Sequence, residues 1–332
     1  MAATSNRTLI SDLGEGEHVS GPFAIINAQL GKTRTDKLYL RCLLCDRSGT
    51  APARMWSIDE TIFNRLPAEG FVWVEGDAQA YQGEMQIIIQ SIDPFDPNEE
   101  MIRELLPASR RNPEEMFAEL CTLFESLEHP AANKLARAFL DDEPLMAAFR
   151  TAPAAKVLHH AYLGGLLEHT LQLCNLADRM LPLYPSLNRD LVLLGLLLHD
   201  MAKTRELMYD RAFDYTDRGL LVGHIVDGVI LLREKVYQPG IDMPPEAIMV
   251  LEHIILSHHG VPEFGAAKVP STPEAIFISN LDDLDAKTEM ALVAAKRDRT
   301  GGPDLRGAFT EKHWALNTRV YRRDPLSNST GS

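Results

Sequence analysis

The residues best suited to chemistry are a histidine and an aspartate that end a strongly apolar stretch. Residues 191–198 are all apolar or glycine, which is typical of a helix buried on all sides, and His199 and Asp200 follow directly. Burying an imidazole and a carboxylate is costly without a partner, and a divalent cation would pair with both. Lys203 follows one turn later and would bring a positive charge to the same region. The alternative is a helix that emerges into solvent, and this dipeptide alone favours it.

Further histidines and aspartates are grouped along the C-terminal half of the chain. Each group is a weak signal by itself, since a lone histidine on an apolar helix is more often a core residue than a ligand. Each group also falls on its own predicted helix, so the whole set, taken in order, is a stronger signal than any one group. In chain order the groups are His169, then His224, then His258 with His259, then Asp282, Asp283 and Asp285.

Composition restricts the class of protein. The chain has 332 residues, enough for two domains, with 45% hydrophobic and 24% charged residues, as in ordinary globular proteins. A net charge of −14 argues against a broad basic surface for duplex DNA, although not against a local basic groove. The chain shows no signal-peptide pattern and no apolar run of membrane-spanning length. Four cysteines imply no disulfide framework, so we expect a cytoplasmic protein without a membrane partner.

The N-terminal part predicts a small β barrel. Alternation and turn residues predict strands at 23–30, 37–46, 50–58, 71–81 and 84–92, with a short helix at 59–66 and a hairpin turn at Gln82-Gly83. Cys42 and Cys45 lie in the second strand. Side chains three residues apart in a strand point to opposite faces and no second cysteine pair is near, so we expect no zinc site there.

The rest of the chain predicts helices almost throughout. We therefore expect a multidomain protein in which a small all-β barrel precedes an all-α domain. The expected boundaries are 1–98 for the barrel, 99–150 for a helical linker, 151–310 for the helical domain and 311–332 for a C-terminal tail, with its last residues disordered.

The motifs DRSGTAPARMWSIDE and GFVWVEGDAQAYQGEMQIIIQSI resemble OB-fold modules of the anticodon-binding and single-strand-binding kind. Such barrels stack bases on aromatic side chains beside a basic groove. The candidates for substrate binding are Tyr39, Arg41, Arg54 and Trp56. The alternatives are that Trp56 is a core residue and that the barrel binds another protein.

The ordered histidines and aspartates resemble the HD superfamily of metal-dependent phosphohydrolases, an all-helical fold. The resemblance implies the ligand set of members that bind two metal ions, with Asp200 as the bridging carboxylate. It makes Asp283 the alternative to Asp282, and gives Asp285 a supporting role. The implied metal ligands are His169, His199, Asp200, His224, His258, His259 and Asp282.

The combination is more specific. An OB barrel joined to a domain with HHAYLGGLLEHT, LLHDMAKTRE, GHI, SHHG and LDAK is similar to the YhaM-type 3′–5′ exoribonucleases, over residues 15 to about 290. One departure is SNLD at 279–282, where the family usually has Ala-Asp. The resemblance implies hydrolysis of single-stranded RNA from the 3′ end to nucleoside 5′-monophosphates.

Two metal ions would supply what phosphodiester hydrolysis needs, namely a nucleophilic water at neutral pH and a sink for phosphoryl charge. Imidazole with carboxylate suits Mn, Fe, Co or Zn better than Mg, and Mn²⁺ is our choice. Lys203 is a candidate catalytic residue that would contact the phosphate, or else an exposed helix lysine. His160 is a candidate substrate contact, or else a surface histidine at a helix start.

Two other functions compete with an RNA exonuclease. The first is an HD hydrolase of a small nucleotide or cyclic dinucleotide, which would not need a single-strand platform. The second is a non-catalytic nucleic-acid-binding regulator, against which the intact ligand set argues. Single-stranded DNA as a substrate and assembly into a homo-oligomer both stay open.

Overall fold

The computed structural model describes residues 8–33, 35–67, 69–81, 84–156, 160–209, 213–296, 308–323 and 326. The chain divides into two compact units, of which one holds residues 1–106 with 287–332 and the other holds residues 107–286. No helix within the described ranges is long and apolar enough to cross a membrane.

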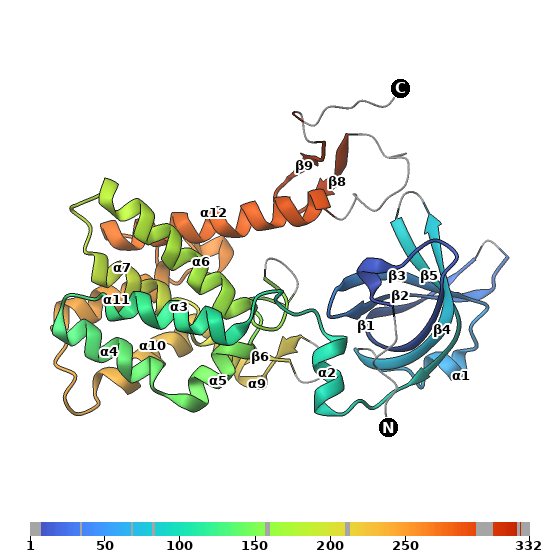
Figure 1. Ribbon diagram of the computed structural model, residues 1–332, viewed down its shortest axis with the longest axis horizontal. Coiled ribbons are helices and arrows are strands. Elements are labelled where there is room, and N and C mark those ends of the chain that lie inside the picture. Colours follow the sequence, from blue (N-terminus) through green and yellow to red (C-terminus); the bar gives the residue numbers. More distant parts are fainter. Residues whose placement is uncertain are drawn as a thin grey trace. The chain divides into compact units, whose positions relative to one another are not determined.

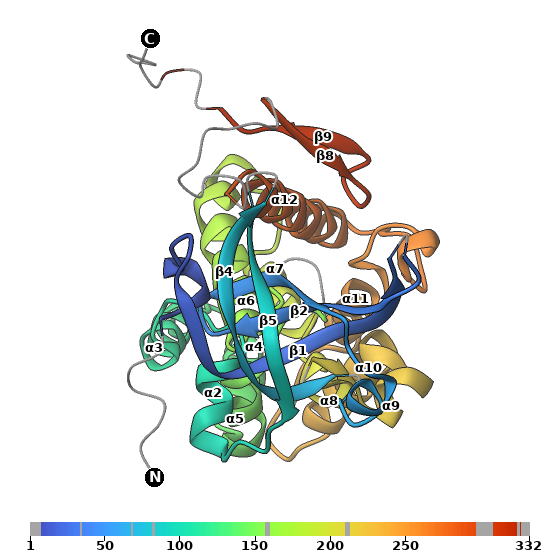
Figure 2. The same ribbon diagram turned by 90° about the vertical axis from the view of Figure 1, so that its right-hand side faces the viewer.

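The first unit contains a closed five-stranded barrel (Figure 2). Its strands follow the order β1-β2-β3-β5-β4, with β3 parallel to β5 and the other neighbours antiparallel. A short 3-10 helix, η1 (Ile10–Asp12), precedes the barrel, α1 follows β3, and α2 follows β5. The bounds are β1 (His18–Lys32), β2 (Leu38–Asp46), β3 (Gly49–Trp56), α1 (Glu60–Phe63), β4 (Gly70–Tyr81), β5 (Glu84–Pro94) and α2 (Glu99–Leu105).

The alternation read from the sequence places the barrel core correctly. Leu40, Cys42 and Leu44 of β2 are buried, and they pack with Phe23, Ile25 and other inward side chains of the barrel. Cys45 on the other face is buried as well. All four cysteines of the chain are free thiols, and burial raises the pKa of Cys42 to about 12. The predicted turn at Gln82-Gly83 lies outside the described residues.

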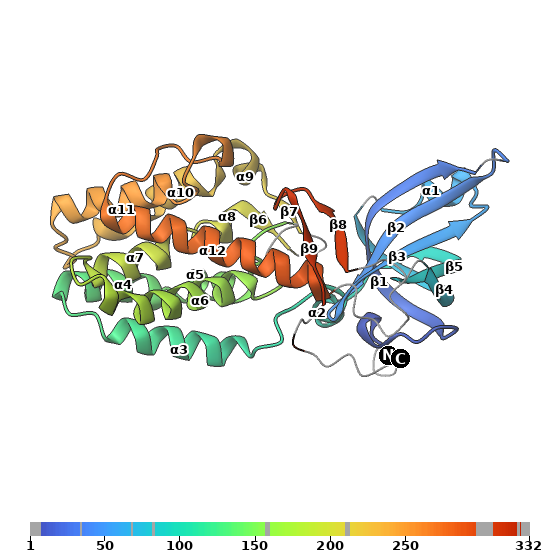
Figure 3. The same ribbon diagram turned by 90° about the horizontal axis from the view of Figure 1, so that it is seen from above.

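The second unit is helical apart from a small ribbon formed by β6 and β7 (Figures 1 and 3). Its helices are α3 (Pro113–Glu125), α4 (Pro130–Leu140), α5 (Glu143–Thr151), α6 (Gly165–Met180), α7 (Arg189–Leu198), α8 (Lys203–Glu206), α9 (Asp217–Leu221), α10 (Gly223–Val236), α11 (Pro245–Ser257) and α12 (Pro273–Lys296). The residues of α12 from 287 onward are counted with the first unit. The ribbon pairs β6 (Leu207–Met208) with β7 (Asp214–Tyr215), and the 3-10 helices are η2 (Leu181–Leu183) and η3 (Pro262–Phe264).

Local sequence signals set where these helices begin. Asn112 and Asp142 cap α3 and α5 by accepting backbone N–H bonds from Glu114 and Leu145, and a proline follows in the first turn of each helix. Asn188 caps α7 in the same way.

One apolar core holds this unit together, and α7 runs through it. The side chains of α7 from Val192 to Leu198 are 2% exposed or less. A Cβ at Gly195 would lie 2.6 Å from Cδ1 of Ile278, so the glycine lets α12 approach α7 closely. Met116, Leu135 and Phe149 of α3, α4 and α5 belong to the same core. The segment expected to be a helical linker therefore packs with the helices that follow it.

The fold class expected from the sequence, an OB-like barrel followed by an all-α domain, is confirmed. The boundaries at residues 98, 150 and 310 remain predictions. The structure adds a hairpin in the region expected to be a tail, formed by β8 (Phe309–His313) and β9 (Thr318–Tyr321). Most of the polar end, 324–332, lies outside the described residues.

Candidate metal centre

Five helices and the residues next to their ends bring the predicted ligands to one place in the helical unit. His199 is the C-terminal cap of α7, and Asp200 follows it in the turn toward α8. His224 is in the first turn of α10, and His258 and His259 directly follow α11. His169 and Asp282 lie within α6 and α12. Because each group sits on a different helix, the packing of the core decides the distances between them.

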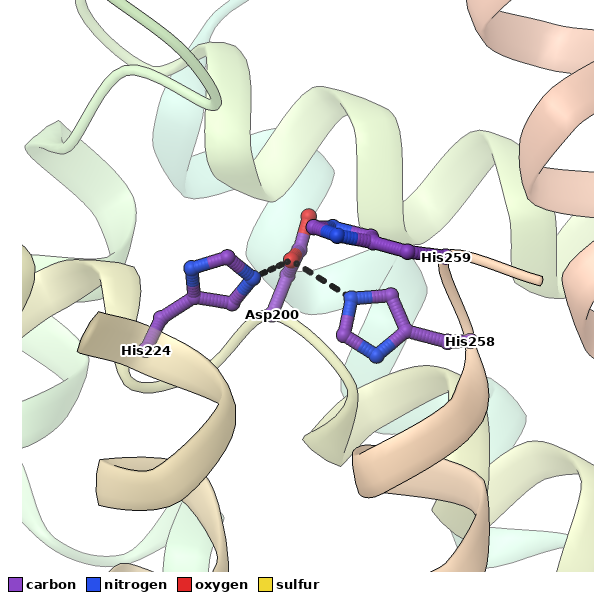
Figure 4. A group of neighbouring side chains, drawn as sticks. All are labelled: Asp200, His224, His258 and His259. Atoms are coloured by element: carbon purple, nitrogen blue, oxygen red, sulfur yellow. Dashed lines mark ion pairs between the residues drawn. The ribbon is translucent and has the colours of Figure 1, made fainter. Parts of the chain in front are cut away.

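One group of four residues surrounds a single carboxylate (Figure 4). Oδ1 of Asp200 lies 3.5 Å from Nε2 of His224 and 3.5 Å from Nε2 of His258. His259 completes the group, and its ring centroid lies 4.3 Å from that of His258. The four ligating atoms lie within 4.8 Å of one another.

A second group of residues lies beside Oδ2, the other carboxylate oxygen of Asp200. His169, His199 and Asp282 form it, with Nε2 of His169 3.2 Å from Oδ1 of Asp282. Oδ2 of Asp200 lies 3.4 Å from Nε2 of His199 and 3.8 Å from Nε2 of His169. Asp200 therefore stands between the two groups with one oxygen toward each.

All five histidines turn the same ring nitrogen toward this centre. Their Nδ1 atoms lie 2.8 to 2.9 Å from oxygens outside it, and their Nε2 atoms are left for the centre. In a neutral imidazole, an acceptor at Nδ1 places the proton on Nδ1 and the lone pair on Nε2, as in histidines that ligate metals. The Nδ1 partners are Asp285 for His169, the carbonyl of Leu196 for His199, Glu206 for His224, the carbonyl of Ile255 for His258 and the carbonyl of Phe264 for His259.

Burial and neighbouring charged groups shift the pKa values of the residues in this centre in opposite directions. Burial raises the pKa of the Asp200 carboxyl, but Lys203 and His199 lower it well below its usual range. Burial would lower the pKa of His169, but hydrogen bonds to Asp282 and Asp285 raise it to about 9. The pKa values of His258 and His224 are lowered, mainly by burial, and that of His259 falls to about 4 for the same reason. These histidines are neutral at pH 7, the form that ligates a metal.

The donor set fits a divalent cation. Among the described side chains, Asp200 Oδ1, His224 Nε2 and His258 Nε2 are buried without a hydrogen-bond partner. Buried polar atoms are nearly always paired, so three unpaired atoms facing one another call for a missing partner. Only atoms with lone pairs face one another at this point, and a cation satisfies them all.

Lys203 and His160 are both buried beside the centre. Lys203 donates a hydrogen bond to Asp200 Oδ2 at 2.7 Å and is 9% exposed, so it is not an exposed helix lysine. His160 is 4% exposed and is not a surface histidine; its Nε2 lies 3.2 Å from Asp285 Oδ2, and its Nδ1 lies 2.7 Å from the Tyr162 hydroxyl. His253 of α11 belongs to neither group, and its Nε2 accepts a hydrogen bond from the backbone N–H of Ser271.

Asp282 joins the centre, whereas Asp283 is exposed and belongs to neither group. Sequence reasoning missed Glu206, which holds both the backbone N–H and the Nδ1 of His224. The signal that could have identified Glu206 is its position three residues after Lys203, at the end of the same short helix.

The barrel carries the other predicted residues on one face. Tyr39 lies opposite Trp56 and Arg41 opposite Arg54 in the pairing of β2 with β3, so all four point to the same side. The rings of Tyr39 and Trp56 lie 5.3 Å apart, and Trp56 is 48% exposed, which excludes a core role. The four residues line a cavity of about 720 Å³ that also includes Gln29 and Lys32.

An unpredicted aromatic residue extends this set. Cζ of Arg54 lies 5.9 Å from the ring of Trp56 and 5.6 Å from that of Tyr81, which is also 48% exposed. The face thus combines exposed rings with guanidinium groups, the arrangement that single-strand-binding barrels use.

Comparisons with known proteins agree with this geometry. The model of the HD domain family matches residues 166–287, so the helical unit is an HD domain. The chain is 33% identical over 307 residues to the 3′-5′ exoribonuclease YhaM of Bacillus velezensis, covering 92% of this chain and 95% of that one. It is 32% identical, with the same coverage, to the 3′-5′ exoribonuclease YhaM of Bacillus pumilus. The chain therefore belongs to the YhaM 3′–5′ exoribonuclease family, as the sequence motifs predicted.

Among solved structures, the second OB-fold domain of replication protein A from Methanococcus maripaludis is similar at 12% identity. It covers 27% of this chain and 96% of that one, with a TM-score of 0.21. The barrel is described by its own strand order, β1-β2-β3-β5-β4, with β3 parallel to β5.

Proposed function

We propose that this protein is a metal-dependent exoribonuclease that shortens single-stranded RNA from its 3′ end and releases nucleoside 5′-monophosphates. One observation carries the proposal: Asp200 stands between two groups of histidine and aspartate ligands, at the signature position of an HD domain. The family membership of the whole chain supplies the polarity and the substrate.

The two groups on either side of Asp200 are the proposed metal ligands. Asp200, His224, His258 and His259 would hold one divalent ion. His169, His199 and Asp282 would hold a second, with Asp200 shared between them. We propose Mn²⁺, because mixed imidazole and carboxylate ligation suits it, with Fe, Co and Zn as alternatives. Bound there, such ions lower the pKa of a coordinated water and neutralise phosphoryl charge.

The residues of the chain then position the substrate. Lys203 is protonated, since the neighbouring Asp200 raises its pKa against the opposing effect of burial. Its ammonium group is proposed to contact a phosphate oxygen as a point charge. Water attacks phosphorus and the 3′ oxygen of the penultimate nucleotide leaves, so the released nucleotide keeps the phosphate on its 5′ carbon.

The barrel is the proposed grip on the strand. Tyr39 and Trp56 would stack on bases, and Arg41 and Arg54 would contact phosphates beside them. His160 is proposed as a residue that positions Asp285 and, through it, His169, because both imidazoles bond the same carboxylate oxygen. The direct contact of His160 with the substrate, expected from the sequence, stays a prediction beside this role.

The test is hydrolysis with Mn²⁺ of single-stranded RNA labelled at its 5′ end. A duplex, a DNA strand and a panel of nucleotides including cyclic dinucleotides are assayed in parallel. We expect a descending ladder from RNA, with nucleoside 5′-monophosphates identified by chromatography. Turnover of nucleotides alone would support the small-nucleotide hydrolase instead, and binding without turnover would support a regulator. Nucleoside 3′-phosphates or 2′,3′-cyclic phosphates would show attack by the RNA's own hydroxyl and would contradict the proposal.

A further inference from the structure

The C-terminal hairpin carries aromatic and basic side chains that the proposed function does not use. Its strands β8 and β9 pair Phe309 with Tyr321, Lys312 with Arg319, and His313 with Thr318. A backbone bond from Arg322 to the carbonyl of Ala308 and a bond from the backbone of Val320 to the Thr310 hydroxyl close the ribbon. The segment is therefore a defined element, although its sequence lies where a tail was expected.

One face of this hairpin combines rings with cations. Residues paired across an antiparallel ribbon point to the same side, as do residues two apart along a strand. Arg319 and Tyr321 are two apart in β9, and both are exposed, while Val320 between them is half-buried. Their partners Lys312 and Phe309 are exposed as well. The Phe309 and Tyr321 rings lie 5.2 Å apart, edge to face, and each is about half exposed.

A third aromatic residue lies at the turn. Trp314 follows β8 directly and is 75% exposed. Its indole presents a large, solvent-facing ring on which an unstacked base can lie. Trp314 stands next in sequence to His313, whose ring accepts the backbone N–H of Leu316 and so holds the turn.

The charge of the segment is opposite to that of the chain. Residues 308–323 contain four basic residues and one acidic residue, whereas the whole protein has a net charge of −14. A basic patch on an acidic protein attracts a polyanion locally, and adjoining rings select one whose bases are unstacked and available. A duplex offers phosphates but no free base faces, so the chemistry favours a single strand.

We infer that the hairpin of β8 and β9 is a second binding element for single-stranded RNA. Trp314 stacks on a base, and Lys312 and Arg319 contact phosphates. The choice of RNA over DNA rests on the proposed function, whereas the single-strand chemistry rests on the hairpin itself. The hairpin adds to the barrel and requires no change in the metal centre.

The test is direct binding by the full-length protein, without hydrolysis. Fluorescence anisotropy measures the affinity for a labelled 20-nucleotide RNA in EDTA, at several salt concentrations. Trp314→Ala should weaken binding about 5- to 150-fold, the usual range for losing one stacked base. The double variant Lys312→Gln/Arg319→Gln should reduce the slope of log affinity against log salt by about 1.4, at about 0.7 per lost phosphate contact.

Two controls separate the inferred contacts from general effects. Lys134→Gln/Arg137→Gln removes two exposed charges of the same kind from α4 and should leave the affinity and the salt slope unchanged. An abasic strand of equal length offers phosphates without bases, so Trp314→Ala should bind it as well as the wild type does. Thermal unfolding midpoints equal to that of the wild type verify folding, and Lys312→Gln alone repeats the salt test if the double variant is unstable.

Unchanged affinity and salt slope in both hairpin variants would overturn the inference and point to a protein partner or a purely structural hairpin. Equal losses on the abasic strand would overturn the stacking role of Trp314. Failure of the proposed function looks different, because the wild type would then bind RNA through the hairpin without degrading it in Mn²⁺. If the hairpin variants bind RNA as the wild type does, and the wild type degrades RNA in Mn²⁺, then the inference about the hairpin fails and the proposed function stands.

Discussion

Asp285 accepts a hydrogen bond from Nδ1 of His169 at 2.9 Å, although 116 residues separate the two in sequence. The carboxylate is 3% exposed and also contacts His160 and Gln172. Burial raises the pKa of Asp285, but hydrogen bonds from the two imidazoles lower it below its usual value. A fixed anion behind a ligating imidazole sets its ring orientation and raises its basicity.

Replacing Asp285 by Asn should therefore weaken the metal centre without removing a ligand. We expect metal affinity or kcat/KM on RNA to fall about 10- to 100-fold, the usual effect of losing such a partner. Titration with Mn²⁺, followed by activity and by calorimetry, measures both. The matched control is Asp283→Asn, an exposed neighbour on the same helix, which should behave as wild type. A larger loss in Asp283→Asn than in Asp285→Asn would contradict the assignment on α12.

Asp200 is expected to be indispensable to turnover. Asp200→Asn keeps the shape of the side chain but removes the charge between the two ligand groups, so we expect kcat to fall at least about 100-fold, with loss of bound metal. Elemental analysis of the purified variant measures the metal, and near-UV circular dichroism checks the fold. Wild-type activity in this variant would show that the site is assigned wrongly.

Tyr39 and Trp56 are expected to serve binding and not chemistry. Replacing both by Ala should weaken binding of long single strands by one to several powers of ten, at roughly 1–3 kcal/mol per stacked base. Hydrolysis of a chromogenic phosphodiester, which offers no strand of bases for the two rings to stack on, should change little. Tyr184→Ala, which removes a half-exposed ring from the helical unit, is the control. Equal losses on both substrates would mean that the two rings support folding.

An ion pair between a buried lysine and a half-buried aspartate makes the helical unit sensitive to acid. Lys235 of α10, which also carries His224, donates a hydrogen bond to Asp142, the cap of α5. This hydrogen bond lowers the pKa of Asp142 in the folded state below its value near 4 in the unfolded state. The stability that the bond contributes is therefore fully present above about pH 4, and it is lost as the pH falls through the lowered pKa of the folded state.

Lys235→Met should therefore cost about 1–2 kcal/mol of unfolding free energy at pH 7, allowing for the partial exposure of Asp142. The difference from wild type should shrink below about pH 4. Urea unfolding at both pH values measures it. The exposed Lys134→Met is the control, and a difference that grows in acid would refute the explanation.

Much of the barrel could be predicted from the sequence alone, and so could the histidines and aspartates that the structure brings together; that they bind metal stays a prediction. Strand alternation at Leu40, Cys42 and Leu44 depends only on neighbours two residues apart, which any strand places on one face. The apolar run before His199 likewise predicts a buried helix that ends at the site. Such patterns can be read from the sequence because they depend only on the local geometry of a strand or a helix.

The partners of those ligands depended on the tertiary structure. Helical spacing puts Asp282 and Asp285 on one face and turns Asp283 away, but only the packing of α12 beside α6 brings that face to His169. Glu206 reaches His224 across a turn and a short ribbon in the same way. The burial of Lys203 and His160 also followed from packing, because an ionisable side chain has no periodic signal that distinguishes a buried from an exposed position. The sequence by itself thus determined which residues could bind metal and in what order, while the packing of the helices decided how each one is held.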